Sequence, residues 1–153
     1  MHYKLQPTVS VLAVVAVLVY LFAPAALPLL FTGSPAREQV TVGDDIPLPA
    51  SPSCERDFGS GMLTGYKCGQ DYVRSAEMGG ITDPALAATR LWRAEVYLPT
   101  DNRPTTDGAV TVLRDGDTAV ILAPTGENKT YTVAVASGVL ISPTIEALQA
   151  VNA

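Results

Sequence analysis

Two cysteines, Cys54 and Cys68, are the residues whose type and spacing most directly imply chemistry. They bound the segment CERDFGSGMLTGYKC, which is too long for a Cys-x-x-Cys redox pair. No histidine lies near them, so the ligand set of a zinc site is missing. In an oxidising compartment such a pair forms a disulfide. We predict a Cys54–Cys68 bridge that closes a loop of about 15 residues and stabilises the fold by about 3 kcal/mol.

The loop between the cysteines is a candidate for binding. It combines several glycines with large apolar or aromatic side chains, namely Phe58, Met62 and Tyr66. On an exposed loop, these three side chains would be able to contact a ligand. The alternative, which we favour, is a structural loop that the disulfide holds closed.

The charged and polar residues predict no catalytic site, no metal site and no cofactor. The one histidine, His2, precedes a long apolar run, which excludes a Ser-His-Asp set or a histidine metal centre after that run. The acidic residues at 44–45 and 115–117 lack the further oxygen ligands of a calcium site, so we interpret both as turns. The chain also lacks a P-loop and a dinucleotide-binding glycine pattern. We therefore expect a protein that is not an enzyme.

An α+β domain over residues 54–153 is expected to position these side chains. Asp83 followed by Pro84 is typical of the N-cap and first residue of a helix. One face of the helix that follows carries the residues expected to pack on a sheet, Ala85, Ala88, Trp92 and Val96. The next segment, EVYLP, has the composition of a strand that ends at Pro99.

The clearest local pattern is AVTVLRDGDTAVILA, which predicts a β-hairpin. Its turn residues are Asp115 and Gly116, and this register pairs Leu113 with Thr118. TYTVAVA predicts a third strand of a small antiparallel sheet. VLIS is either a further strand or a lead into a terminal helix over about residues 142–151.

Residues 32–53 are rich in proline, serine and glycine and lack a sustained helical or strand period. We predict an extended linker that Pro47, Pro49 and Pro52 stiffen. Within it, only EQVTV has the composition of a short strand.

The apolar run before the linker, VLAVVAVLVYLFAPAALPLLF, contains no charge. Residues 11–31 as a helix would measure about 31 Å, which matches a hydrocarbon core of about 30 Å. Lys4 precedes the run, and the next cation, Arg37, follows it. This charge pattern favours a cytoplasmic N-terminus over 1–8, a transmembrane helix over 9–31 and an extracytoplasmic C-terminal part.

The alternative is a cleaved signal peptide, because Ala23-Pro24-Ala25 fits the small-x-small cleavage pattern. Against cleavage, the sequence after the cut, ALPLLF, is again apolar. In a retained helix Pro24 and Pro28 remove backbone donors, and Tyr20 places a hydroxyl near the middle of the bilayer. Either Tyr20 bonds a carbonyl one turn back, or neighbouring membrane helices contact Tyr20 and the kinked outer half.

The run Val11–Phe31 and the exported cysteine pair give a layout of anchor, linker and domain. This layout resembles the small single-pass accessory subunits of actinobacterial respiratory supercomplexes. The resemblance implies a non-catalytic subunit whose helix docks against integral membrane cytochrome subunits and whose domain covers them on the outer face. It supplies no functional residues.

The distribution of charge along the chain indicates which class of molecule it binds. All 15 acidic residues follow the apolar run, whereas one of the 10 basic residues, Lys4, precedes it. The exported part is therefore acidic, and we do not expect it to bind nucleic acid. We expect an accessory subunit of a larger membrane complex, held in the lipid bilayer; the alternative is a secreted or tethered ligand-binding module of the cell envelope.

Overall fold

The computed structural model describes residue 17 and residues 37–43, 45–49, 53–59, 61–125 and 129–152. The chain divides into two compact units, and the second runs from Ala36 to Ala153. The expected membrane helix over 9–31, with Tyr20, Pro24 and Pro28, lies almost entirely outside the described residues. Among the helices that the structure does describe, none has the length and hydrophobicity needed to cross a membrane.

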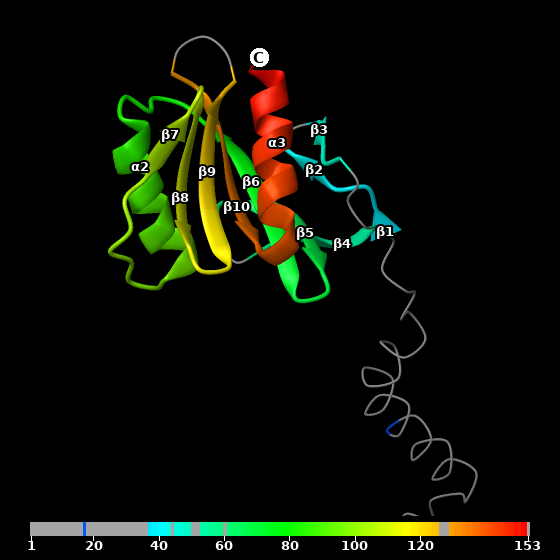
Figure 1. Cartoon of the computed structure of the whole chain (residues 1–153). Helices are drawn as coiled ribbons and strands as arrows, with labels where there is room; N and C mark the ends of the chain where they lie inside the picture. The colour runs from blue at the N-terminus through cyan, green and yellow to red at the C-terminus, as the bar shows by residue number, and fades with distance from the viewer. Residues whose placement is uncertain are drawn as a thin grey trace, which may run out of the picture. The chain divides into compact units, whose positions relative to one another are not determined.

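An antiparallel sheet of eight strands forms the centre of the second unit, in the order β1-β4-β5-β6-β10-β9-β8-β7 (Figure 1). Its strands are β1 Arg37–Glu38, β4 Cys54–Asp57, β5 Thr64–Cys68, β6 Asp71–Met78, β7 Thr105–Asp107, β8 Val110–Asp115, β9 Thr118–Pro124 and β10 Tyr131–Ser137. Two meanders, β4 to β6 and β7 to β10, meet where β6 pairs with β10. The predicted α+β class with an antiparallel sheet is confirmed.

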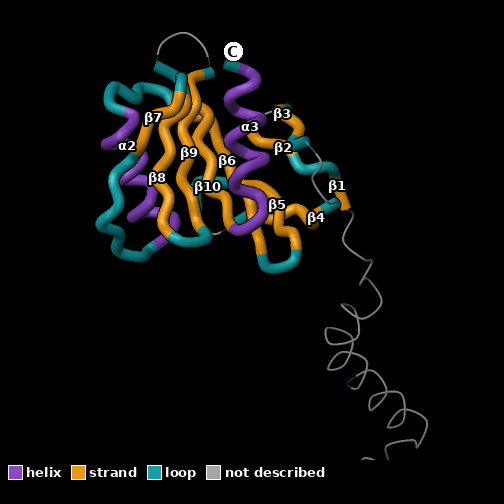
Figure 2. The backbone as a smooth tube through the Cα atoms, in the orientation of Figure 1, coloured by secondary structure: helices purple, strands orange, loops and turns teal. Residues whose placement is uncertain are grey.

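Helices cover both faces of this sheet. Helix α2 (Pro84–Leu91) continues into the π-helix η1 (Trp92–Val96) on one face. Helix α3 (Ile141–Val151), preceded by the 3₁₀ turn η2 (Gly138–Leu140), lies across the other face. A separate hairpin of β2 (Thr41–Val42) and β3 (Ile46–Pro47) lies beside α3 (Figure 2).

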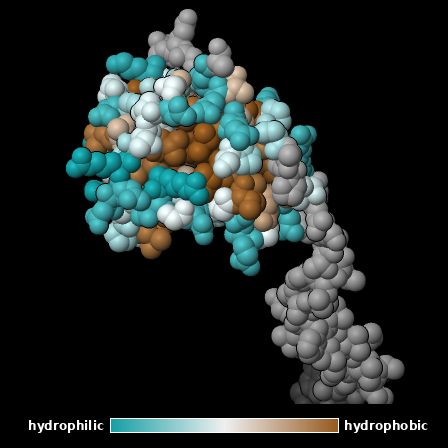
Figure 3. Space-filling model, viewed as in Figure 1, coloured by the Kyte–Doolittle hydropathy of each residue, from teal (hydrophilic) through white to brown (hydrophobic). Residues whose placement is uncertain are grey.

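The central strands β9 and β10 are buried along almost their whole length because each face has its own hydrophobic cluster. Toward α3 these strands present mainly alanines, which allow the helix to approach closely: Ala119, Ala123, Ala134 and Ala136. Toward α2 they present larger side chains: Val120, Leu122, Val133 and Val135. Figure 3 shows that hydrophobic residues remain visible at the centre of the α3 face, surrounded by hydrophilic ones.

The predicted start of the first helix is confirmed. Asp83 is the N-cap, its Oδ1 accepts a hydrogen bond of 2.9 Å from the Leu86 N–H, and Pro84 is the first helical residue. Trp92 is 2% exposed and belongs to the same cluster as Ala88 and sheet residues such as Leu113. The tryptophan therefore packs on the sheet as expected.

The predicted strand EVYLP is wrong. Residues 92–96 form a π-helix, and Tyr97 ends it in the left-handed conformation with φ of 59°. The physical reason lies in Trp92, whose indole N–H donates a hydrogen bond of 2.8 Å to the Leu98 carbonyl. This bond curls the chain around the buried indole and prevents an extended course.

The predicted β-hairpin is present, but its turn is shifted by one residue. The loop residues are Gly116 and Asp117, and Leu113 pairs with Val120 instead of Thr118. Gly116 takes the first loop position with φ of +56°, which an L side chain adopts at a cost. The observed register also places two core residues opposite each other, in the cluster beneath α2.

The predicted linker over residues 32–53 is wrong for the residues that the structure describes. Val40, Val42 and Leu48 are at most 1% exposed and belong to the core beneath α3. The Leu48 N–H donates to the Val40 carbonyl at 3.0 Å and closes the β2–β3 hairpin. Burial of these apolar side chains outweighs the weak strand propensity of the prolines and glycine around them.

The C-terminal segment follows the second of the two expected courses. VLIS forms no strand, because η2 leads directly into α3. Helix α3 begins at Ile141 and ends at Val151, close to the predicted bounds of 142–151.

Candidate functional site

The predicted disulfide is confirmed and defines the base of the candidate site. Cys54 and Cys68 lie opposite each other at the open end of the β4–β5 hairpin, with their Cα atoms 4.8 Å apart. The edge strand β1 pairs with β4 at the same place, since Glu38 is the partner of Cys54. The disulfide therefore fixes the edge of the sheet at which the second unit begins.

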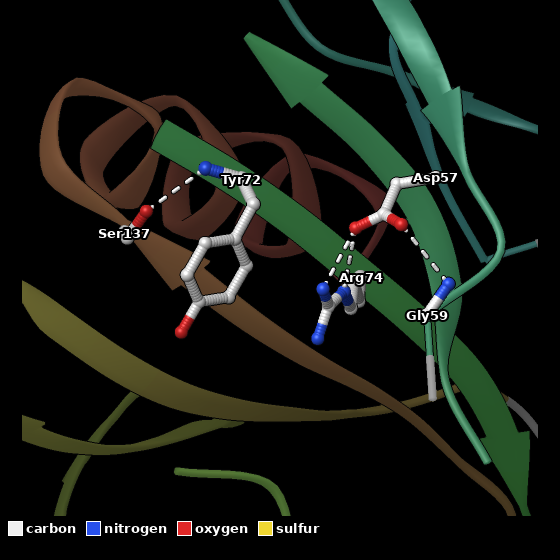
Figure 4. Close-up of polar contacts among 5 residues, drawn as sticks. All are labelled: Asp57, Gly59, Tyr72, Arg74 and Ser137. Carbon is white, nitrogen blue, oxygen red and sulfur yellow. Dashed lines mark hydrogen bonds and ion pairs between the residues drawn. The ribbon is translucent and has the colours of Figure 1, made fainter. Parts of the chain in front are cut away.

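At the other end of the hairpin, Asp57 orders the connecting loop (Figure 4). Its Oδ2 accepts hydrogen bonds from Arg74 Nη2 at 2.7 Å and from Arg74 Nε at 2.9 Å. Its Oδ1 accepts a bond of 3.0 Å from the Gly59 N–H. The hydrogen bond from Arg74, followed by that from Gly59, holds the pKa of the Asp57 carboxyl below its ordinary value of 3.8.

The Arg74 guanidinium is itself held by the sheet. Its central carbon lies 5.0 Å from the centre of the Tyr72 ring, two residues away on the same face of β6. Tyr72 is tied to the neighbouring strand, because its backbone N–H donates to Ser137 Oγ at 2.8 Å (Figure 4). The loop after β4 thus rests on a chain of contacts that reaches the middle of the sheet.

The structure separates the three residues of the predicted binding loop. Phe58 is 72% exposed and Met62 is 75% exposed, both in the loop between β4 and β5. Tyr66 instead belongs to the core beneath α3, with its hydroxyl 3.3 Å from Thr41 Oγ1. Phe58 and Met62 remain available for binding, whereas Tyr66 has a structural position.

A second loop, which the sequence did not indicate, lies against the first. A Cβ atom built on Gly61 would lie 2.7 Å from both carboxylate oxygens of Glu95, so the two segments touch there. Glu95 lies in the last turn of η1, and the residues that follow this helix, Tyr97 and Leu98, are 76% and 62% exposed. We call the four exposed side chains Phe58, Met62, Tyr97 and Leu98 the loop surface.

The second loop is also fixed in position. The hydrogen bond from the Trp92 indole to the Leu98 carbonyl ties its end to the core, and Tyr97 has a positive φ. Non-glycine residues in this conformation store backbone strain and are frequent at functional sites. Tyr97 is therefore a candidate contact residue. The sequence did not reveal it, because the composition of EVYLP predicted a strand there.

A polar pocket of about 360 Å³ lies between β2 and the strands β4, β5 and β6. Its charged residues are Arg56 and Glu77, both exposed. Much of its polar lining is already satisfied: the Thr41 hydroxyl lies within hydrogen-bonding distance of the Tyr66 hydroxyl, and Ser75 Oγ accepts from the Gly43 N–H at 2.9 Å. The pocket has room for a small polar molecule.

An apolar groove of about 320 Å³ follows α2. It lies between this helix and the end of β6, where Met78, Ile81, Leu86 and Leu91 line it. Arg90 is the one basic residue in its lining.

The described residues contain no group of three or more histidine, cysteine or acidic side chains placed to hold a metal ion.

No known family model, curated protein or solved structure matches the chain. The loop surface is the strongest candidate site, because its exposed apolar side chains belong to two segments that hydrogen bonds hold in place.

Proposed function

We propose that this chain is a non-catalytic accessory subunit, anchored by residues 9–31 in a membrane and docked through its exported domain on integral membrane proteins. The observation that carries the proposal is the early start of the folded unit, at Ala36. Between Phe31 and Arg37 the chain can cover at most about 21 Å. A domain on so short a connection is confined to the membrane surface, where the outer faces of integral membrane proteins are its nearest neighbours.

The loop surface supports the same proposal. Phe58, Met62, Tyr97 and Leu98 are large exposed side chains on two segments that approach each other at Gly61 and Glu95. Aromatic residues and methionine are enriched in the cores of protein interfaces. Because loops held in one conformation lose little entropy on binding, the hydrogen bonds of Asp57 and Trp92 favour docking.

The proposal includes no catalytic residue and no cofactor. The layout resembles that of accessory subunits around respiratory complexes, which makes a respiratory complex the first partner to test. Tyr20, Pro24 and Pro28 are the proposed contacts of the anchor, since a membrane helix that stands alone gains nothing from a mid-bilayer hydroxyl and two prolines.

The test is the intact mass of the mature protein, extracted in mild detergent, together with the identity of what co-purifies. We expect a mass that includes the apolar run, two hydrogens fewer than the reduced chain, and at least one integral membrane protein in fixed proportion. Tyr20→Phe and Pro28→Leu should weaken co-purification while the chain stays in the membrane. A mature chain that begins at Ala26, or a monomer without partners, would contradict the proposal.

The polar pocket favours a second candidate, a ligand-binding module of the cell envelope. Arg56 and Glu77 would contact a small polar molecule such as a sugar or a peptide terminus. Thermal unfolding of the full chain with envelope sugars and peptides tests this candidate, with Arg56→Ala and Glu77→Ala as the variants. A ligand that raises the Tm of the wild type but not of these variants would support it, and no shift with any compound would contradict it.

A further inference from the structure

The polar pocket beside β2 carries opposite charges at its two ends. Arg56 on β4 lies opposite Tyr66 on β5, which in turn lies opposite Val73 on β6. Glu77 follows Val73 by four residues on β6, so Arg56 and Glu77 are on the same face of the sheet. Strand spacing and rise put their Cα atoms about 10 Å apart across the strands and about 13 Å apart along them, or about 16 Å in all. Both residues line the pocket, and they are too far apart to pair with each other.

The charged residues around the pocket leave both ends free. Along β4 the acidic neighbours of Arg56 point to the other face of the sheet, because the side chains of a strand alternate. Glu38, which is diagonal to Arg56 across the β1–β4 pair, forms no ion pair with it. Opposite Glu77, the next strand β10 carries the uncharged Thr132. The pocket therefore offers a guanidinium at one end and a carboxylate at the other.

Hydroxyl groups line the pocket between these ends. Ser75 Oγ accepts the Gly43 N–H at 2.9 Å, and its own proton has no acceptor among the residues that the structure describes. The hydroxyls of Thr41 and Tyr66, 3.3 Å apart, share one hydrogen bond, so one of their two protons is left over. Donors of this kind suit the carbonyl oxygens of a peptide backbone.

We infer that the polar pocket binds a short peptide with free ends, its carboxylate at Arg56 and its ammonium at Glu77. An ion pair of about 3 Å at each end leaves about 10 Å for the ligand to span, and an extended residue covers about 3.5 Å, so a tripeptide fits. The pocket volume of about 360 Å³ is within the range of small-ligand sites. This peptide site deepens the second candidate function, the ligand-binding module, and rests on it.

Charge and length distinguish this ligand from other small polar molecules. A neutral sugar pairs with neither end of the pocket, and a simple anion or cation pairs with one end and is repelled by the other. A free amino acid carries both charges, but its single residue of about 3.5 Å is too short to reach Arg56 and Glu77 together.

Calorimetric titration of the full chain, purified in mild detergent, with trialanine tests the inference. N-acetyl-trialanine and trialanine amide each lack one of the two charges of the ligand. We expect each blocked form to bind about fivefold more weakly than trialanine, because one ion pair near solvent contributes up to about that factor. Free alanine should bind at least as weakly as the blocked forms.

Two variants assign the ends of the peptide. With Arg56→Gln, trialanine and its amide should bind equally, whereas acetylation of the amino end should still weaken binding. With Glu77→Gln the two results should be exchanged. Glu55→Gln is the matched control, because Glu55 is the neighbour of Arg56 on β4 and points to the other face, so both preferences should remain. Loss of the preference at one end alone, with an unchanged Tm, cannot come from misfolding.

The outcomes separate the peptide site from the functions proposed above. Equal affinity for trialanine and its blocked forms overturns the peptide site, and so does a preference for free ends that survives both variants. If a sugar raises the Tm and trialanine does not bind, the ligand-binding module stands and the peptide site falls. If no compound binds, both fall. The accessory function is tested separately, by the mass of the mature chain and its co-purifying proteins.

Discussion

Asp57 holds the loop after β4 in one conformation through three hydrogen bonds. Two come from Arg74 and one from the Gly59 backbone, and all reach the same carboxylate. The carboxylate is partly exposed, so water weakens each bond, but the opposite charges of Arg74 and Asp57 add to the strength of the two bonds between them. The position of Phe58, the next residue, depends directly on this carboxylate.

We predict that Asp57→Asn lowers the free energy of unfolding by about 1 kcal/mol at neutral pH, because the amide carries no charge for Arg74. The folded pKa of Asp57 lies below 3.8, so its contribution is present above that value and is lost as the pH falls through the folded pKa. Urea unfolding at several pH values measures this. The difference between wild type and variant should be constant from about pH 7 to about pH 5 and shrink below 3.8.

Asp101→Asn is the matched control, because Asp101 is exposed and outside this network. Its free energy of unfolding at neutral pH should match that of the wild type. If Asp57→Asn behaved in the same way, Asp57 would not stabilise the loop.

Gly65 is a position where the backbone leaves no room for a side chain. A Cβ there would overlap the Val73 carbonyl oxygen and lie 2.7 Å from the Arg74 Cα. We predict that Gly65→Ala separates β5 from β6 locally and lowers the free energy of unfolding by about 1–3 kcal/mol, as overpacking does elsewhere. Urea unfolding at neutral pH measures the loss.

Gly79→Ala provides the comparison for this change. The nearest atom to a Cβ on Gly79 is Thr130 Oγ1 at 3.9 Å, which is an ordinary contact. Its effect should stay within about 0.5 kcal/mol. Equal stability of the two variants would show that β5 can shift without loss.

The β4–β5 hairpin depends on the disulfide at its base. A variant with both Cys54→Ser and Cys68→Ser should lose about 3 kcal/mol, because the closed loop of about 15 residues gains freedom in the unfolded chain. Urea unfolding of the oxidised wild type against the variant measures the loss. Dithiothreitol should lower the wild type to the level of the variant and leave the variant unchanged; a variant as stable as the oxidised wild type would contradict the prediction.

The sequence correctly predicted the elements that depend on residues close to them in the chain. The Asp83 cap and the tryptophan packing followed from side chains within one or two helical turns. The hairpin was predicted, but its register was not. Pairing Leu113 with Thr118 or with Val120 leaves Leu113 on the same face, so the hydrophobic pattern cannot choose between the two.

The sequence did not predict the elements that form only through contacts with other parts of the fold. Residues 40–43 and 45–48 pack as a hairpin only because α3 and the sheet offer a complementary apolar surface, although the alternation of Val40 with Val42 and of Ile46 with Leu48 was a signal for it. The turn at Tyr97 depends on the buried indole of Trp92. Half of the loop surface, Phe58 and Met62, was therefore predictable from its glycine-rich context, and the other half was not.

Because the folded unit begins at Ala36, the connection between it and the expected membrane helix is short. Residues 32–36 are too few to let the domain leave the membrane surface if 9–31 is the anchor. Under the proposed function, such confinement would raise the effective concentration of the loop surface near a membrane partner, which would strengthen a weak contact without any new interaction. A longer connection should therefore weaken docking and leave folding unchanged.

We predict that a flexible Gly/Ser spacer of about 20 residues, inserted between Ser34 and Pro35, spreads the domain over about 25 Å and lowers docking several-fold. Maleimide labelling of Met62→Cys in native membranes measures docking, and it should become several-fold faster with the spacer.

The same spacer added after Ala153 is the control, since it leaves the connection unchanged. Because the second unit has both of its hydrophobic clusters within 37–152, the Tm of both insertions should match the wild type. Labelling that the internal spacer leaves unchanged would mean that the domain docks by its own affinity, and that the short connection has no part in it.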